Sequence, residues 1–319
     1  MNNILIAGGD GFIGYNLQQK LAENPDNNIL IIDDYSTGVV HENNNVRRIY
    51  GDISKINLTQ IPVLKKISID CIYNLASPAS PLQYKQQPIH TIETNTNGVI
   101  NLLNLAEQKE AVYIQASTSE IYGEAEIPFK EESKSITDPF NYKSCYIQSK
   151  ILAETITNTY QQEKNVNTKI IRIFNTYGEN MRLNDGRVIP TFIKQAIQQE
   201  PLTIHGNGEQ TRSFLYISDL INALTKLPYI TDHKPINIGN TAEMTINTLA
   251  YLICKKTNNY NTNNQLEKVL NTVNIDTPYT KDTKRRKPDI TRAKRILNWK
   301  PQVNIHDGLH KTILSYKKS

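Results

Sequence analysis

The chain has 319 residues, 38% of them hydrophobic, and a formal net charge of +5. This length is enough for a large core or two lobes. No apolar run approaches the ~20 residues that a membrane-spanning helix needs, and the first predicted strand begins too early to leave room for a signal peptide. Three widely spaced cysteines, Cys71, Cys145 and Cys254, favour a reducing compartment. We therefore expect a cytoplasmic protein without a membrane partner or a disulfide framework.

The first predicted elements are a buried strand over 4–7, a glycine-rich turn and a helix. The turn carries Gly8, Gly11 and Gly14 in the pattern G-x-x-G-x-x-G. Glycine permits a tight turn, a close approach of the backbone to pyrophosphate and close packing of the helix on the strand. The phosphates then meet the positive N-terminus of the helix. The pattern predicts a dinucleotide site, and a glycine loop that binds no nucleotide is the alternative.

The second predicted strand, 29–32, ends at Asp33, about 20 residues after the glycines. A carboxylate at this place can accept a hydrogen bond from a ribose 2′-hydroxyl and repels a 2′-phosphate. Asp33 therefore favours NAD over NADP as the cofactor. The alternative is that Asp33 only forms a turn.

Strand-like runs and helical patterns alternate through the first half of the chain. Further strands are predicted at 71–75, 111–115 and 169–173, and helices at 92–107 and 145–160. This alternation predicts an α/β fold, a Rossmann-type doubly wound parallel sheet, whose ligands bind outside the carboxyl ends of the strands. Thr118, Ser119 and Glu120 follow one such strand.

The pattern changes after Asn175, where short segments, prolines and loops begin. A further strand at 235–238 is expected to rejoin the sheet. We therefore predict a nucleotide-binding domain over 1–175 with a return near 215–240, and a smaller mixed C-terminal substrate lobe over 176–214 and 241–319. The asparagine-rich stretch 258–264 is predicted to be a flexible loop.

Tyr146 and Lys150 stand four positions apart, in a Tyr-x-x-x-Lys pattern. On a helix these residues lie on one face, a turn apart. A free tyrosine has a pKa near ~10, and a neighbouring ammonium lowers it towards the working pH of a general base. The pattern alone is weak, but together with the glycine turn it predicts a nicotinamide enzyme with a tyrosine base.

Two further clusters predict no additional site. The basic run Lys284-Arg285-Arg286-Lys287 lacks the interleaved aromatic residues of a nucleic-acid groove, so no nucleic acid is expected; the run is either a solvated face or a clamp for an acidic ligand. His306 and His310 lie one helical turn apart without the glutamate of H-E-x-x-H. They favour a solvated face, and no metal site is predicted.

Six local runs carry a resemblance to a known family. They are Leu75-Ala76-Ser77-Pro78-Ala79-Ser80-Pro81 with Tyr84, Thr118-Ser119-Glu120-Ile121-Tyr122-Gly123, Ser144-Cys145-Tyr146, Asp185-Gly186-Arg187-Val188, Gln210-Thr211-Arg212-Ser213-Phe214 and Arg286-Lys287-Pro288-Asp289-Ile290. Together they resemble the extended short-chain dehydrogenase/reductase family over nearly the whole chain. Within it the chain is similar to the branch that decarboxylates UDP-glucuronate. Ser119 stands where the 4,6-dehydratases usually carry aspartate, and the 4-epimerases usually lack Glu120.

The chain departs from the pattern of this branch at several positions. Lys143 stands for the usual arginine, Ile147-Gln148-Ser149 for Asp-Glu-Gly, and Glu179 and Asn180 for Pro-Arg. His205 replaces an aromatic residue before Gly206.

The resemblance implies NAD-dependent decarboxylation of UDP-glucuronate to UDP-xylose through a UDP-4-keto intermediate, with the hydride returned to the sugar. The implied catalytic residues are Thr118, Ser119, Glu120, Tyr146, Lys150 and Arg212. The implied NAD-binding residues are Gly8, Gly11, Phe12, Ile13, Gly14, Asp33, Asp52, Ile53, Leu75, Ala76, Asn95, Tyr146 and Lys150. The implied residues for the UDP-sugar acid are Pro81, Tyr84, Asn175, Arg187, Arg212 and Arg286.

Alternatives stay open at this point. The alternatives to a decarboxylase are an NAD-dependent nucleotide-sugar 4-epimerase or 4,6-dehydratase, and a non-catalytic NAD-binding scaffold. In the simpler alternatives, Arg212 is a surface ion-pair partner, Glu120 is a solvated acid and Tyr84 is a packing residue. The resemblance also implies a homodimer formed through the helix at 92–107 and the helix of Tyr146.

Overall fold

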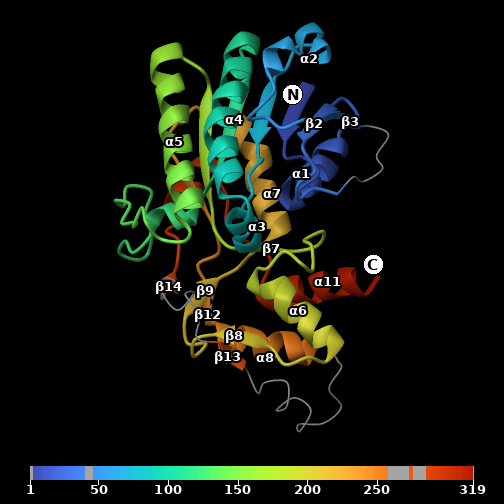
Figure 1. Cartoon of the computed structure of the whole chain (residues 1–319), viewed down its shortest axis with the longest axis vertical. Helices are drawn as coiled ribbons and strands as arrows, with labels where there is room; N and C mark the ends of the chain where they lie inside the picture. Colours follow the sequence, from blue (N-terminus) through green and yellow to red (C-terminus); the bar gives the residue numbers. More distant parts are fainter. Residues whose placement is uncertain (1–2, 40–45, 258–272, 276–284, 319) are drawn as a thin grey trace.

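The computed structural model describes residues 3–39, 46–257, 273–275 and 285–318. The asparagine-rich stretch 258–264 and Lys284 of the basic run lie outside these residues. A large sheet flanked by helices forms one part of the molecule, and a smaller part with short strands lies below it in Figure 1. Within the described residues, no helix is both long and apolar enough to cross a bilayer.

The large sheet has seven parallel strands in the order β11-β6-β5-β4-β1-β2-β3. The strands are β1 (Asn3–Ala7), β2 (Asn28–Asp33), β3 (Val46–Tyr50), β4 (Cys71–Asn74), β5 (Val112–Thr118), β6 (Thr168–Ile173) and β11 (Ile236–Ile238). The order reverses between β1 and β4, and ligands of open α/β sheets bind at such a switch point. The sequence predicted six of these strands and missed β3, because this edge strand contains Arg47 and Arg48 and is only partly buried.

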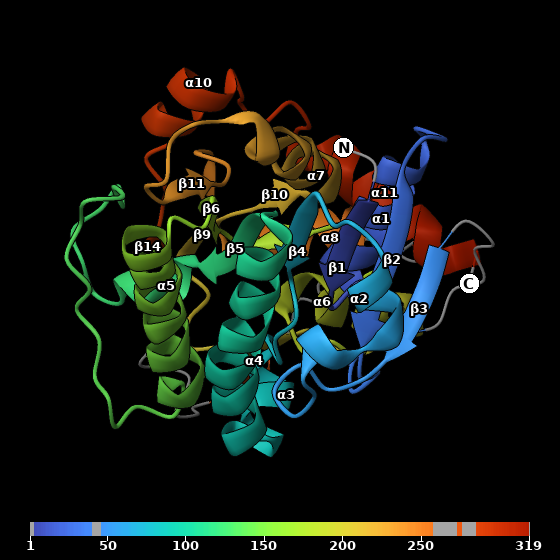
Figure 2. The same cartoon turned by 90° about the horizontal axis from the view of Figure 1, so that it is seen from above.

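Helices cover both faces of the sheet. The sequence alternates accordingly: Ile4 and Ile6 pack with Leu17 on one face, and Leu5 packs with Leu102 on the other. The first face carries α1 (Phe12–Ala22) and α7 (Ile217–Lys226), and the second carries α4 (Pro88–Lys109) and α5 (Ser144–Lys164). The long helices α4 and α5 lie side by side in both views (Figures 1 and 2), and they contain the two helices that the sequence predicted.

In the part of the chain that the structure describes, three short sheets lie in the smaller part of the molecule. β9 (Thr211–Ser213) pairs antiparallel with β12 (Glu243–Thr245) and parallel with β14 (Arg285–Arg286). The two other pairs are β8 (Thr203–His205) with β13 (Val273–Ile275), and β7 (Thr176–Tyr177) with β10 (Leu215–Tyr216). A doubly wound parallel sheet with a smaller mixed C-terminal lobe is thereby confirmed.

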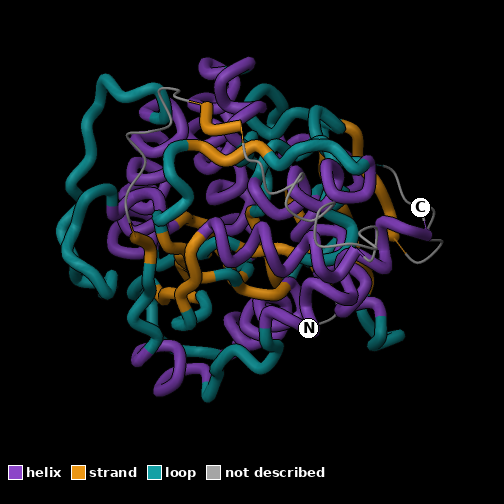
Figure 3. The backbone as a smooth tube through the Cα atoms, turned by 90° about the horizontal axis from the view of Figure 1, so that it is seen from below, coloured by secondary structure: helices purple, strands orange, loops and turns teal. Residues whose placement is uncertain are grey.

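The remaining helices within the described residues are short or belong to the C-terminal half. They are η1 (Leu58–Gln60), α2 (Pro62–Lys66), α3 (Pro81–Gln86), η2 (Ser119–Tyr122), α6 (Val188–Gln198), η3 (Leu227–Tyr229), α8 (Ile246–Thr257), α10 (Thr291–Leu297) and α11 (Ile305–Lys318). Seen from below, helices flank the strands on several sides (Figure 3).

The chain crosses between the two parts more than once. It leaves the sheet after β6, passes through β7 to β9, and returns so that β11 pairs with β6. This path agrees with a boundary near residue 175 and a return near 215–240, although the domain limits stay a prediction.

Candidate active site

The glycine turn brings the end of β1 against the start of α1. Gly8 has a φ of +74°, and a Cβ atom there would lie 2.7 Å from the Cα of Ala76. A Cβ atom on Gly14 would lie 2.2 Å from the carbonyl oxygen of Gly8. Gly11, the N-cap of α1, differs, since the only neighbour its Cβ would meet is that oxygen at 3.3 Å. Gly8 and Gly14 are thus required by packing, whereas Gly11 keeps space open in front of the helix.

A cavity of about 810 Å³ lies against this turn. Ten of the residues predicted to bind the cofactor line it: Gly8, Gly11, Phe12, Ile13, Gly14, Asp33, Asp52, Ile53, Leu75 and Ala76. Asn95 is not among the lining residues of the cavities described here. It is buried on α4, where its Nδ2 donates to the Ser149 Oγ at 3.0 Å.

Asp33 ends β2 in the wall of this cavity and is buried. Its carboxylate accepts hydrogen bonds from the backbone N–H groups of Asp10 (3.0 Å) and Tyr35 (2.9 Å). Burial raises the pKa of Asp33 above its ordinary value, and the two backbone donors oppose this effect. The carboxylate is therefore held in one orientation at the mouth of the turn.

The wall of the first cavity near Asp33 and Asp52 contains a residue that sequence reasoning missed. His90 on α4 places its Nε2 3.2 Å from an oxygen of Asp34 and its Nδ1 3.7 Å from one of Asp52. Ser36, Ser54 and Lys55 complete the contacts of the two carboxylates. His90 had no local signal, because its partners come from loops after two different strands.

The cavity fits a dinucleotide. Ser77 Oγ and Thr94 Oγ1 are buried in its wall and have no hydrogen-bond partner among the described residues. Buried hydroxyls of this kind are normally satisfied, so their placement suits a polar ligand. The space in front of Gly11 and the N-terminus of α1 suits the phosphates of such a ligand.

A second cavity, of about 940 Å³, adjoins the first and shares wall residues with it, among them Phe12, Leu75 and Arg187. It is lined by all the predicted catalytic and substrate residues: Thr118, Ser119, Glu120, Tyr146, Lys150, Arg212, Pro81, Tyr84, Asn175, Arg187 and Arg286. The side chains come from both parts of the molecule. The two cavities therefore adjoin along these shared residues.

The core of the second cavity is built by the end of β5 and the first turns of α5. Thr118 ends β5 and caps η2, because its hydroxyl accepts from the Glu120 N–H at 3.2 Å. The Thr118 side chain acts on the Tyr146 phenol and lowers its pKa. The ring of Tyr146 stacks on that of Tyr84, with centroids 5.4 Å apart and planes 14° apart. The stacking on Tyr84 fixes the orientation of the Tyr146 ring.

The charge states of Tyr146 and Lys150 are set mainly by burial. Burial raises the pKa of Tyr146, and the Thr118 side chain and the Arg187 charge act in the opposite direction. Burial lowers the pKa of Lys150 to about 7, and the charge of Glu154 opposes this. The Lys150 Nζ donates to the Ala116 carbonyl at 3.0 Å and lies 5.9 Å from the centre of the Tyr146 ring.

This arrangement differs from the expectation that Lys150 makes Tyr146 acidic. The groups that lower the pKa of Tyr146 here are Thr118, Arg187 and Arg286. Lys150 is buried, and its ammonium is directed to a backbone carbonyl of β5 instead of the phenol.

Two arginines lie side by side at the other wall. In the parallel pair β9–β14, Arg286 is in register with Arg212, so both side chains leave the same face of the sheet. The Arg286 guanidinium forms a two-pronged ion pair with Glu120, with one contact of 2.7 Å. The Lys143 Nζ lies 3.9 Å from the same carboxylate. The Arg212 Nη1 donates to the Thr211 carbonyl at 2.8 Å.

The remaining predicted substrate residues also face the second cavity. Arg187 contacts Asp185 at 3.2 Å and donates to the Ala79 carbonyl at 3.1 Å. The Nδ2 of Asn175 is buried and has no partner among the described residues. Asn175 therefore offers a donor to a bound ligand.

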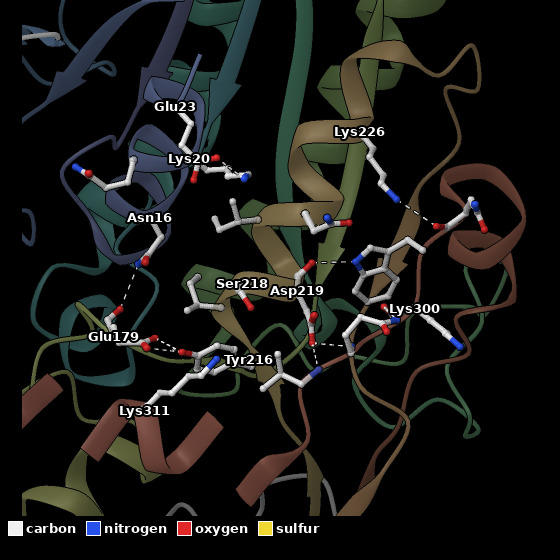
Figure 4. Close-up of a pocket in the computed structure, with 18 of the residues that line it drawn as sticks. Asn16, Lys20, Glu23, Glu179, Tyr216, Ser218, Asp219, Lys226, Lys300 and Lys311 are labelled. Carbon is white, nitrogen blue, oxygen red and sulfur yellow. Dashed lines mark hydrogen bonds and ion pairs between the residues drawn. The ribbon is translucent and has the colours of Figure 1, made fainter. Parts of the chain in front are cut away.

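A further cavity, of about 1020 Å³, lies beside α1 and α7, apart from the predicted site residues (Figure 4). Its acids are satisfied internally: the Asp219 carboxylate accepts from the backbone N–H groups of Gln302 and Val303, and Glu179 accepts from the Tyr216 hydroxyl. His306 and His310 are exposed on α11. Arg285 of the basic run pairs with Glu243 at 2.6 Å.

Comparison with known proteins agrees with this geometry. A family model described as GDP-mannose 4,6 dehydratase matches residues 5–312. The chain is 40% identical over 311 residues to UDP-glucuronic acid decarboxylase 5 of Arabidopsis thaliana, covering 96% of this chain and 86% of that protein.

Two solved structures are similar over 99% of both chains, each at 25% identity. They are the UDP-glucose 4-epimerase of Thermotoga maritima with UDP-glucose, with a TM-score of 0.87, and the UDP-glucuronic acid 4-epimerase of Bacillus cereus with UDP-glucuronic acid and NAD, with a TM-score of 0.83. The family resemblance predicted from the sequence motifs is confirmed. The chain belongs to the extended short-chain dehydrogenase/reductase family, within the group of the GDP-mannose 4,6 dehydratase model.

Proposed function

We propose that this protein decarboxylates UDP-glucuronate to UDP-xylose with NAD as a cofactor that is regenerated in each cycle. One observation carries the proposal: Tyr146, Thr118 and the paired Glu120 and Arg286 line one cavity, which shares wall residues with the glycine-turn cavity. The full-length relative named UDP-glucuronic acid decarboxylase supports it.

The glycine-turn cavity is proposed to hold NAD. Gly11 and the N-terminus of α1 would receive the pyrophosphate, and Asp33 the adenosine ribose. Bound there, NAD would supply the acceptor for the hydride from C4 of the sugar and, in its reduced form, the hydride that returns to the sugar after decarboxylation. The carboxylate of Asp33 leaves no favourable place for a 2′-phosphate, because like charges repel.

Tyr146 is proposed to be the general base. In its phenolate form, the Tyr146 side chain, on which the Thr118 side chain acts, accepts the proton of the C4 hydroxyl and becomes a neutral phenol. The resulting 4-ketone stands β to the carboxylate, so the electrons of the breaking carbon–carbon bond flow into the ketone when carbon dioxide leaves. The developing enolate needs nearby positive charge or donors, which the Thr118 hydroxyl and Lys150 supply from one side.

The opposite wall is proposed to orient the sugar acid. Arg212 and Arg286 stand in register and present two guanidinium groups to an anionic ligand. Glu120, held by Arg286, would order the water or the proton that later reaches C5. Asn175 and Arg187 are proposed to bind the UDP part, with the buried Nδ2 of Asn175 as the donor.

Incubation with UDP-glucuronate and NAD tests the proposal. We expect release of carbon dioxide together with a UDP-pentose, measured by mass spectrometry, and no net formation of NADH. A 4-epimer of the substrate without carbon dioxide would instead identify an epimerase. Loss of water would identify a dehydratase, and an unchanged substrate would favour a non-catalytic NAD-binding scaffold.

The protein is further proposed to be a homodimer formed through α4 and α5. The outer faces of these helices carry the exposed apolar side chains of Ile89, Ile92 and Leu152. Apolar side chains gathered on two adjacent helices are typical of an interaction surface.

A further inference from the structure

A polar cluster lies directly behind the catalytic pair, and none of its members has been placed in the reaction so far. Glu154 on α5 receives two hydrogen bonds from Arg172 of β6, at 3.0 and 2.8 Å. The Ser117 hydroxyl donates to the same carboxylate at 2.5 Å. Arg172 also donates to the Tyr122 hydroxyl at 2.9 Å.

Two members of this cluster, Glu154 and Ser117, stand close to catalytic residues on the same helix or strand. Glu154 follows Lys150 by one helical turn, so both side chains lie on one face of α5. Ser117 immediately precedes Thr118 on β5, and the hydrogen bond from Ser117 to Glu154 joins that end of the strand to α5.

Among the described charged groups near Lys150, Glu154 is the one that favours its ammonium form. Lys150 is 3% exposed, and burial disfavours its ammonium form. Among the described charged groups, Glu154 is the one that counters this effect. Arg172 from β6 and Tyr122 from η2 face Glu154, and Tyr146 faces Lys150 from α5.

We propose that Glu154 is a positioning residue that keeps Lys150 in its ammonium form and, through Ser117, fixes the end of β5 that carries Thr118. Arg172 holds the carboxylate in place by its two-pronged contact. Without this carboxylate, a smaller fraction of Lys150 is charged near pH 7, and the site loses positive charge beside the developing enolate of the substrate. This role rests on the proposed function of Tyr146 and Lys150.

The charge state of Lys150 can be followed without substrate. Lysine labelled with ¹³C at Cε reports protonation of Nζ by its chemical shift, and the Lys150→Met variant identifies the Lys150 signal by its loss. In the NAD-bound protein, we expect Glu154→Gln to move the midpoint of the Lys150 titration to lower pH by about one unit. Glu163→Gln, an exposed change on the same helix, should leave the midpoint unchanged.

A second readout is the pH profile of kcat with UDP-glucuronate. The alkaline limb of the profile should move to lower pH in Glu154→Gln, whereas a purely structural role would lower kcat without moving the limb. If wild-type protein does not turn over UDP-glucuronate, the proposed function fails while the Lys150 titration still tests the role of Glu154.

Glu154→Asp provides a test if the glutamine variant does not fold. This variant keeps the carboxylate, but its side chain is shorter by one methylene group, so the charge lies farther from Lys150. We therefore expect the midpoint of the Lys150 titration to move in the same direction by a smaller amount. An unchanged Lys150 midpoint in a folded Glu154→Gln or Glu154→Asp variant would overturn the proposal.

Discussion

At the scale of single residues, Tyr146 stacks on Tyr84, and the Thr118 side chain lowers the pKa of its phenol. Tyr146→Phe removes the phenol oxygen and keeps the ring, so the stacking persists. A positioned general base typically contributes 10²–10⁴-fold, and we expect kcat to fall by about that factor. The dissociation constant for NAD, measured by calorimetry, should stay within about twofold because the glycine-turn cavity is untouched.

Tyr160→Phe on the same helix is the matched control for this change. Its hydroxyl contacts Asn104 outside the site, so turnover should be retained. Near-normal turnover of Tyr146→Phe would contradict the assignment of the base.

Burial of the charged Lys150 side chain lowers the free energy of unfolding, and the size of this effect depends on pH. Its pKa is about 7 in the fold because of burial, against about 10.4 in an unfolded chain. Between these values the unfolded state binds a proton that the folded state has lost, so stability rises with pH through this window. Below pH 7 both states are charged, and the cost is fully present.

Lys150→Met removes this cost. We expect it to raise the free energy of unfolding at pH 6 by about 2 kcal/mol, after allowance for the lost hydrogen bond to Ala116. The gain should shrink as the pH approaches 10. Urea denaturation at both pH values measures it, with Lys164→Met on the exposed side of α5 as the control. A variant less stable than wild type at pH 6 would contradict the argument.

At the scale of elements, the β1–α1 turn separates the packing role of glycine from its binding role. A methyl group at Gly14 would meet the backbone of Gly8 and Gly9 at 2.2 and 2.6 Å, and backbone does not yield as a flexible side chain does. We expect Gly14→Ala to destabilise the protein by roughly 2 kcal/mol or more.

Gly11→Ala should behave in the opposite way. Its backbone is extended at φ −77°, and the added methyl group meets only the Gly8 oxygen at 3.3 Å. The fold should be retained, while NAD affinity falls about tenfold or more, because the methyl group occupies the approach to the phosphates. Thermal unfolding and calorimetry on both variants check this contrast; equal losses of stability would contradict it.

At the scale of the whole molecule, the proposed dimer makes a testable claim about the outer faces of α4 and α5. Ile92 and Leu152 are 44% and 46% exposed there. The double change Ile92→Glu and Leu152→Glu places charges in the proposed interface. Light scattering at micromolar concentration should give twice the mass of one chain for the wild type and a single chain for the variant.

Tyr229→Glu is the control for this experiment, since Tyr229 is exposed on η3, outside the two helices. It should leave the dimer intact. A wild-type protein that runs as a monomer would rule out the proposed assembly.

Local sequence was sufficient for the parts of the fold that depend on short-range order. The glycine turn, six of the seven strands and the cores of α4 and α5 follow from apolar periodicity and from turn residues, because each involves neighbours along the chain. The edge strand β3 was not predicted, because its Arg47 and Arg48 interrupt the apolar run that marks a buried strand.

The sequence predicted which residues belong to the site, but it did not predict which of them contact one another. The motifs named Glu120, Arg212 and Arg286, yet only the tertiary structure sets Arg286 beside Arg212 on β14 and pairs it with Glu120. Likewise the spacing of Tyr146 and Lys150 placed them on one helix face, but burial and the long-range contacts of β5, β6 and α5 decide their charges. Dielectric surroundings and cross-chain pairing arise from residues far apart in sequence, and no local pattern encodes them.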